Sequence, residues 1–281
     1  MTDTIYIIGN GFDLHHGLKT SYSNFRDDHA KKGSLWNDLL DIYGDSQLND
    51  EYWWRDFENM LGRIDYSNLI NTRNGEALGF MKVKNLMKGK LPPLFGSWIK
   101  GVEKQIDTER IKLMKEIKTD SLFFTFNYTL LLEKVYHVDD ERVWHIHESI
   151  KHVDDIVVGH DADGGQLVKY TQEYYKDHTN ISPSYANQIN QEVLNGAKKV
   201  RNRIYLQEEE FYQYCDIKHF IAMGFSFNDI DMPYMEKIID VNRNIADTDW
   251  TLYVHSPKDY DAIEKLLSMG IDKSKIATKN W

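Results

Sequence analysis

The chain has 281 residues, with 34 Lys and Arg against 44 Asp and Glu, which gives a formal net charge of −10 at pH 7. This balance argues against a general polyanion-binding surface, because neutralising phosphates requires an excess of Lys and Arg; nucleic acid is not an expected partner. An apolar fraction of 41% and an aromatic fraction of 13% predict a sizeable folded core. Cys215 is the single cysteine, which excludes an intramolecular disulfide bond and a thiolate zinc cluster.

The first four residues lack the basic segment and the apolar run of a signal peptide. No stretch approaches the ~20 apolar residues that a membrane-spanning helix requires. We therefore expect a cytoplasmic protein with no membrane partner.

Six short apolar runs predict β-strands, and several of them end at Gly, Asn or His. They lie at 5–8, 122–126, 143–146, 156–159, 220–224 and 250–254. The first run has no polar alternation, which is typical of a strand buried on both faces. Helical patterns lie between many of the runs. This alternation predicts an α/β fold with an open, mostly parallel, Rossmann-like sheet.

Residues 22–120 separate the first two strands and have mainly helical character. This span is too long for a simple crossover between neighbouring strands, so we expect a large helical insertion within a single domain of residues 1–281. The helices expected in the insertion are 23–30, 53–64, 76–87 and 94–117, and those expected later are 185–214, 232–242 and 259–269.

The turn after the first strand is the sharpest local feature. Gly9-Asn10-Gly11 ends a buried strand, and glycines there let the backbone approach a ligand while the next helix offers N–H groups to a phosphate. Gly17 comes too late to complete a G-x-G-x-x-G fingerprint. The structural alternative is a tight turn in which Asp13 caps the helix.

A second polar turn, Thr125 to Thr129, follows the second strand. Ligands of open parallel sheets bind outside the carboxyl ends of the strands, and Asn127 offers both a donor and an acceptor for a ribose hydroxyl or a water molecule. The alternative is ordinary turn chemistry, with Thr129 capping the next helix.

Two further turns carry candidate side chains. Alternation along a strand places His145 and His147 on one face, a spacing that could also support a metal site, although no third ligand lies nearby in the sequence. After the run at 220–224, Ser226 is placed to meet a ligand, whereas Asp229 or Asp231 would cap the helix that begins near Pro233.

Several segments in chain order, from residue 5 to about 235, resemble the bacteriophage abortive infection AbiH family. The first reads Ile7-Ile8-Gly9-Asn10-Gly11-Phe12-Asp13-Leu14, and the others are 17–22, 54–58, 124–129, 145–147, 159–160 and 224–234. Membership of this family implies a role in antiphage defence.

The same order of motifs is similar to the wider sirtuin-like NAD-binding fold, which implies NAD as ligand or substrate. The resemblance assigns NAD binding to Gly9, Asn10, Gly11, Asp13, Thr125, Gly224 and Ser226, and Gly17 also falls on the first motif of that resemblance. It assigns catalysis to Asn127 and His147.

Three positions depart from the sirtuin-like pattern. Asp13 replaces Ser, Thr129 replaces Asp, and Glu148 replaces the Gly that usually follows the catalytic histidine. Thr129 would weaken the positioning of the nicotinamide ribose, and Glu148 adds a carboxylate beside His147. Because there is no cysteine zinc module, the resemblance does not imply a sirtuin-type protein deacetylase.

The leading hypothesis is an NAD glycohydrolase in which Asn127 orients the ribose hydroxyls or the attacking water and His147 acts as general base. No metal is expected for this reaction. One alternative is a non-catalytic nucleotide-binding sensor or toxin that acts on a partner. Another is a metal-dependent nuclease, with a metal ion held by Asp13, His147 and His160. A small-molecule nucleotide is the expected partner, while a phage-derived trigger and a homo-oligomer stay open.

Overall fold

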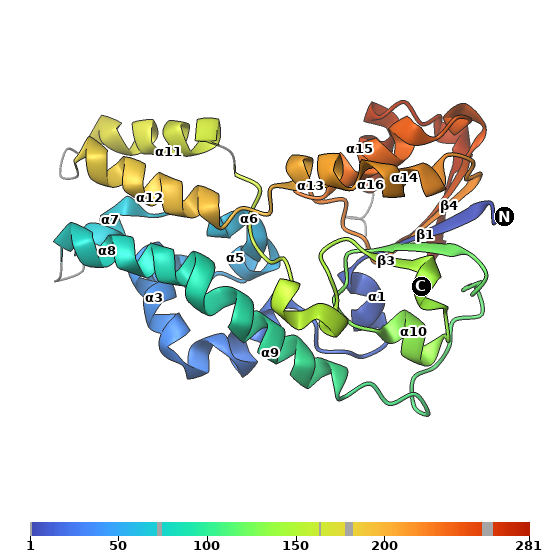
Figure 1. Ribbon diagram of the computed structural model, residues 1–281, viewed down its shortest axis with the longest axis horizontal. Coiled ribbons are helices and arrows are strands. Elements are labelled where there is room, and N and C mark those ends of the chain that lie inside the picture. Colours follow the sequence, from blue (N-terminus) through green and yellow to red (C-terminus); the bar gives the residue numbers. More distant parts are fainter. Residues whose placement is uncertain (1, 72–74, 163, 178–181, 255–260) are drawn as a thin grey trace. The chain divides into compact units, whose positions relative to one another are not determined.

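The computed structural model describes residues 2–71, 75–162, 164–177, 182–254 and 261–281. The chain divides into two compact units, a sheet unit of residues 1–20, 101–153 and 200–281 and a helical unit of residues 21–100 and 154–199 (Figure 1). The single domain expected over 1–281, with its insertion over 22–120, stays a prediction.

The sheet unit contains six strands in the order β3-β2-β1-β4-β5-β6, and every neighbouring pair is parallel. The strands are β1 (Thr4–Ile8), β2 (Leu122–Thr125), β3 (Val143–His145), β4 (His219–Met223), β5 (Asp249–Val254) and β6 (Ile276–Asn280). This order is that of the doubly wound dinucleotide-binding fold, so the expected α/β class with an open parallel sheet is confirmed. The strand order reverses between β1 and β4, which makes their carboxyl ends the topological switch point.

Side-chain alternation divides the sheet into two apolar faces. All five residues of β1 are buried, as its uninterrupted apolar run predicts. Ile5 and Ile7 belong to a continuous core with residues of the helices on one face of the sheet, while Tyr6 points to the opposite face and stacks on Phe123 at 4.9 Å. The helices of the sheet unit are α1 (Asn10–His15), α10 (Leu131–Val135), α13 (Val200–Leu206), α14 (Glu208–Phe211), α15 (Met232–Val241) and α16 (Asp261–Ser268).

The helical unit packs around aromatic side chains. Its elements are α2 (Tyr22–Asp28), α3 (Ser34–Tyr43), α4 (Asp45–Leu48), α5 (Glu51–Arg55), α6 (Phe57–Leu61), α7 (Tyr66–Asn71), α8 (Gly75–Lys84), the π-helix η2 (Asn85–Lys90), α9 (Leu91–Glu103), α11 (Gly164–Asp177) and α12 (Pro183–Asn195). Within it, α8 packs against α3, α7 and α12, and α11 packs against α12 (Figure 1). Short 3-10 turns across the chain are η1 (Ala30–Lys32), η3 (Asp140–Arg142), η4 (Ile150–Asp155), η5 (Tyr212–Tyr214), η6 (Ile245–Asp247) and η8 (Lys273–Lys275).

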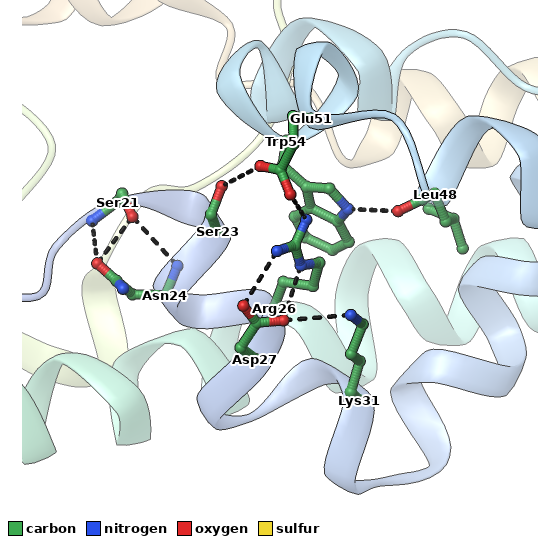
Figure 2. A network of polar contacts seen from close by, with 9 residues as sticks. All are labelled: Ser21, Ser23, Asn24, Arg26, Asp27, Lys31, Leu48, Glu51 and Trp54. Carbon is green, nitrogen blue, oxygen red and sulfur yellow. Dashed lines mark hydrogen bonds and ion pairs between the residues drawn. The ribbon is translucent and has the colours of Figure 1, made fainter.

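A polar network joins α2 to α5 in this unit (Figure 2). The guanidinium of Arg26 donates to Asp27 at 2.8 Å and to Glu51 at 2.6 Å, and it lies 5.7 Å from the ring centre of Trp54. The Trp54 indole in turn donates to the carbonyl of Leu48 at 2.8 Å. The network therefore fixes a buried tryptophan and two helices together.

The predicted strand at 156–159 is wrong. These residues form no strand, and the backbone N–H of Gly159 instead donates to Glu58 at 3.3 Å within the helical unit. Glu58 also pairs with Lys198, whose side chain is fully buried, at 2.9 Å. An apolar run buried among helices has the same composition as a buried strand, which explains the error.

The predicted helices at 94–117 and 53–64 are both interrupted. The helix α9 ends at Glu103, and the chain from 104 to 117 runs in turns. The second prediction is divided into α5 and α6 at Asp56, which has a non-helical ψ of 30°. The expected helix at 259–269 corresponds to α16, although residues 259–260 lie outside the described part of the chain.

Candidate functional site

The turn after β1 meets the turn after β4 through their backbones. The N–H of Gly9 donates to the carbonyl of Met223 at 3.0 Å, and that of Gly11 donates to Gly224 at 2.9 Å. A Cβ atom at Gly9 would lie 2.5 Å from the Gly224 oxygen, and one at Gly224 would lie 2.1 Å from the Phe12 nitrogen. Glycine is therefore required at these positions by the contact between the two turns, independently of any ligand.

Asp13 lies inside α1 rather than at its start. The N-cap is Gly9, and Asp13 is 1% exposed, so the expectation that Asp13 caps this helix is wrong. Its carboxylate accepts hydrogen bonds from the Asn127 side-chain amide at 2.9 Å and from the Thr129 hydroxyl at 2.7 Å. Thr129 therefore bonds to Asp13 through its side chain.

Asn127 links three parts of the site. Its side-chain amide donates both to Asp13 and, at 3.1 Å, to the carbonyl of Gly9, while its backbone N–H donates to the Thr125 hydroxyl at 3.1 Å. Asn127 is 6% exposed and Thr125 1%. The turns after β1 and β2 are thus held in one arrangement by an oriented amide.

Burial dominates the protonation of the Asp13 carboxyl. Removal from water raises its pKa to about 7, partly opposed by the hydrogen bonds from Thr129 and Asn127, which stabilise the ionised form. A buried carboxyl that titrates near neutral pH can hold or release a proton under physiological conditions.

The histidines at and just after the end of β3, His145 and His147, have different surroundings. The strand β3 ends at His145, so strand alternation does not extend to His147, and the expected common face is not formed by a strand. The ring of His145 is fixed between the Asn127 carbonyl, 2.7 Å from Nδ1, and the Glu133 carboxylate, 3.0 Å from Nε2.

His147 is 2% exposed and lies among the rings of Phe126, Tyr128 and Tyr234, at centroid distances of 5.7, 6.3 and 5.8 Å. Its Nε2 atom is 3.8 Å from Oδ1 of Asp231. This apolar environment strengthens the electrostatic interaction between imidazole and carboxylate. The site therefore contains a buried His147 whose imidazole lies near the partly buried carboxylate of Asp231.

Sequence reasoning assigned the wrong role to Asp231. The residue occupies the N-cap position of α15, but its side chain makes no capping hydrogen bond. Asp229 forms an ion pair with Lys265 at 2.6 Å and is 87% exposed, so it does not serve as the cap either. The sequence has two aspartates just before the start of α15, and a helix uses at most one N-cap side chain. At least one of the two aspartates was therefore available for another role.

Other predicted residues lie nearer the surface or carry backbone strain. Ser226 is exposed and Asn10 is half-buried, so both are accessible to a ligand at the switch point. Glu148 has φ of 64°, in the left-handed region that favours glycine. The structure thus gives a backbone reason for a glycine at this position. The assigned roles of all these residues in binding or catalysis stay predictions.

His160 belongs to the helical unit. Its Nε2 donates to the Val193 carbonyl at 2.9 Å and its Nδ1 accepts from the Ala162 N–H at 3.0 Å, and burial lowers its pKa to about 4. Both ring nitrogens are therefore occupied by the backbone, which disfavours His160 as a metal ligand. Within the described ranges, no three His, Cys, Asp or Glu side chains are arranged to hold a metal ion.

The fold and the turns define a doubly wound α/β protein with a polar cluster at the switch point of its parallel sheet. The chain belongs to the bacteriophage abortive infection AbiH family, whose model matches residues 5–254. Antiphage defence by abortive infection is the function that this family indicates. A search of curated proteins gave no match. None of the helices in the described part of the chain is long and apolar enough to cross a membrane.

Proposed function

We propose that this chain is a cytoplasmic antiphage defence protein that binds NAD at the β1/β4 switch point and hydrolyses its nicotinamide N-glycosidic bond. The observation that carries the proposal is the buried cluster at the carboxyl ends of the strands, where Asn127 bonds to Asp13 and His147 faces Asp231. The strand order supports it, because dinucleotides bind doubly wound sheets at this point.

Binding would begin at the accessible side chains. Asn10 and Ser226 flank the crossing of the β1 and β4 turns and would contact the nucleotide. Asn127 would orient the nicotinamide ribose or the water, because its amide is already fixed by Gly9 and Asp13.

Hydrolysis requires a water molecule to attack C1′ of the ribose as the bond from C1′ to the nicotinamide nitrogen breaks. His147 would accept the proton released from that water, and nicotinamide would leave as a neutral base with the bonding electron pair. Asp231 would orient the imidazole and stabilise the imidazolium. Because His147 is 2% exposed, a surrounding aromatic ring must move to admit substrate, and the closed site excludes bulk water.

A nucleotide-binding sensor or toxin without catalysis is the second candidate. It is favoured by the Gly11 N–H, which donates to Gly224 and is therefore engaged within the protein rather than presented to a phosphate. Binding of a nucleotide without turnover would distinguish this candidate. The proposal also includes a phage-derived trigger and assembly into a homo-oligomer.

The test is calorimetric titration with NAD, combined with chromatography of released nicotinamide, on protein of measured oligomeric state with and without extract from phage-infected cells. Asn127→Ala and His147→Ala should each lower nicotinamide release at least about a hundredfold. His152→Ala is the matched control because His152 is exposed. Absence of NAD binding under both conditions would reject the proposal, and binding without release would favour the sensor.

A further inference from the structure

A cavity lies in the sheet unit beside the C-terminal end of α1. It has a volume of about 960 Å³ and is bounded by the end of α1, by residues 105–116 and by the carboxyl ends of β5 and β6. None of Asp13, Asn127, His147 or Asp231 lines it. Its size suits an organic ligand rather than a single ion, because pockets for small molecules measure roughly 300–1,000 Å³.

One wall of the cavity is aromatic. The ring of Trp281 lies 4.6 Å from that of His15 and 5.9 Å from that of Tyr253, measured between centroids. Tyr253 is 9% exposed and is fixed in the sheet by the pairing of β5 with β4 and β6. Such a wall offers stacking to a planar ring.

Another wall of the cavity, formed by residues 105–116, is cationic although the chain as a whole carries a charge of −10. Three of its side chains, Arg110, Lys112 and Lys115, are positive, against Asp107 and Glu116. Arg110 pairs with Asp107 at 3.1 Å, whereas Lys112 and Lys115 form no ion pair with any residue in the described ranges. This wall therefore offers the charges of two lysines to an anion, with the Glu116 carboxylate beside them.

Two buried tyrosines hold this cationic segment in place. The hydroxyl of Tyr136 accepts from the Met114 N–H at 3.0 Å and donates to Nε2 of His16, 2.6 Å away. The hydroxyl of Tyr6 donates to the Glu116 carbonyl at 2.6 Å and accepts from the Lys118 N–H at 3.1 Å. Lys112 and Lys115 therefore lie on a backbone that is anchored before a ligand binds, which lowers the entropic cost of binding.

We infer that this cavity binds a nucleoside phosphate, with the base against Trp281 and Tyr253 and the phosphate between Lys112 and Lys115. The combination of the two walls selects this class. A small inorganic anion would make no use of the aromatic wall, and an uncharged apolar ligand would leave the lysines without a partner.

The test is calorimetry on the full chain with three probes, AMP, adenosine and inorganic phosphate. The double variant Lys112→Glu with Lys115→Glu should raise the Kd for AMP about tenfold and leave adenosine unchanged. Trp281→Ala should raise the Kd for AMP and adenosine about fivefold and leave inorganic phosphate unchanged. Lys104→Glu with Lys118→Glu is the matched control, because both lysines are exposed and neither side chain lines the cavity.

The inference does not depend on NAD cleavage, since its readout is binding of AMP. Failure of AMP to bind the native chain would overturn it. AMP binding that both cavity variants leave unchanged, but that Ser226→Ala weakens, would also overturn it and place the nucleotide at the β1/β4 turns. The lysine variants lie on the surface, so they remain informative if Trp281→Ala fails to fold.

Discussion

The hydroxyl of Thr129 donates a hydrogen bond of 2.7 Å to the buried carboxylate of Asp13. The contact therefore consists of one hydroxyl donor and one carboxylate acceptor. Exchanging the two, with Ser at position 13 and Asp at position 129, would keep one donor and one acceptor in the same contact.

This exchange predicts the outcome of a double-mutant cycle. Thr129→Asp alone places a second carboxylate against Asp13 in a buried site and should lower the free energy of unfolding by about 3 kcal/mol. Combining Thr129→Asp with Asp13→Ser restores one hydroxyl and one carboxylate, so most of that loss should be recovered. Chemical denaturation measures both variants. If the double variant is no more stable than Thr129→Asp alone, the contact between residues 13 and 129 is not the source of the loss of stability.

The raised pKa of Asp13 predicts a pH dependence of stability. The carboxyl has a pKa of about 7 when folded against 3.8 when unfolded, so between these values the folded state binds more protons and the native chain loses stability as the pH rises. Asp13→Asn removes this titration. The stability of the variant relative to the native chain should therefore increase with pH, by at most about 1.4 kcal/mol per pH unit.

Asp272→Asn is the matched control for that measurement. Hydrogen bonds from Ser274 lower the pKa of Asp272, so this residue titrates below the range of interest. The difference in the free energy of unfolding between Asp272→Asn and the native chain should stay constant between about pH 5 and pH 8. An equally flat difference for Asp13→Asn would show that the Asp13 carboxyl is already ionised throughout this range.

The sheet was more predictable than the site for a physical reason. A strand such as β1 is buried on both faces, so its local composition reveals it. The edge strand β6 is mostly exposed and contains Ala277, Thr278 and Lys279, and it is defined by backbone pairing with β5, which leaves little local signal. Burial among helices produced the opposite error at 156–159, where an apolar run suggested a strand.

The turns at the site were predictable individually, but their contacts were not. Asn127 and Asp13 are 114 residues apart in the chain, and their hydrogen bond depends on the pairing of β1 with β2. The glycines were read as making room for a ligand, whereas Gly9 and Gly224 make room for each other. Asp231 was read as a helix cap, because its proximity to His147 becomes visible only when β3 and α15 are placed together.

Asp231 supplies a prediction about the rate of the proposed reaction. Asp231→Asn keeps the size of the side chain and removes the charge 3.8 Å from His147, so kcat for nicotinamide release should fall about a hundredfold. KM should change little, because the carboxylate acts through the imidazole. Asp229 lies in the same turn but pairs with Lys265. The kcat of the Asp229→Asn variant should therefore stay within about twofold of the native value. Equal losses of kcat in both variants would show that Asp231 has no specific role in the reaction.

Substitution of Glu148 can separate the effect of its backbone conformation on stability from the effect of its carboxylate on the reaction. Its φ of 64° is unfavourable for any residue with a Cβ atom, so Glu148→Gly should raise the free energy of unfolding by about 1 kcal/mol. Glu141→Gly, at an exposed position without a positive φ, should lower it by about 0.5–1 kcal/mol. If Glu148→Gly is instead destabilising, the carboxylate makes a contact that outweighs the strain. If the variant is more stable but releases nicotinamide more slowly, the strain is retained because the carboxylate beside His147 contributes to the reaction.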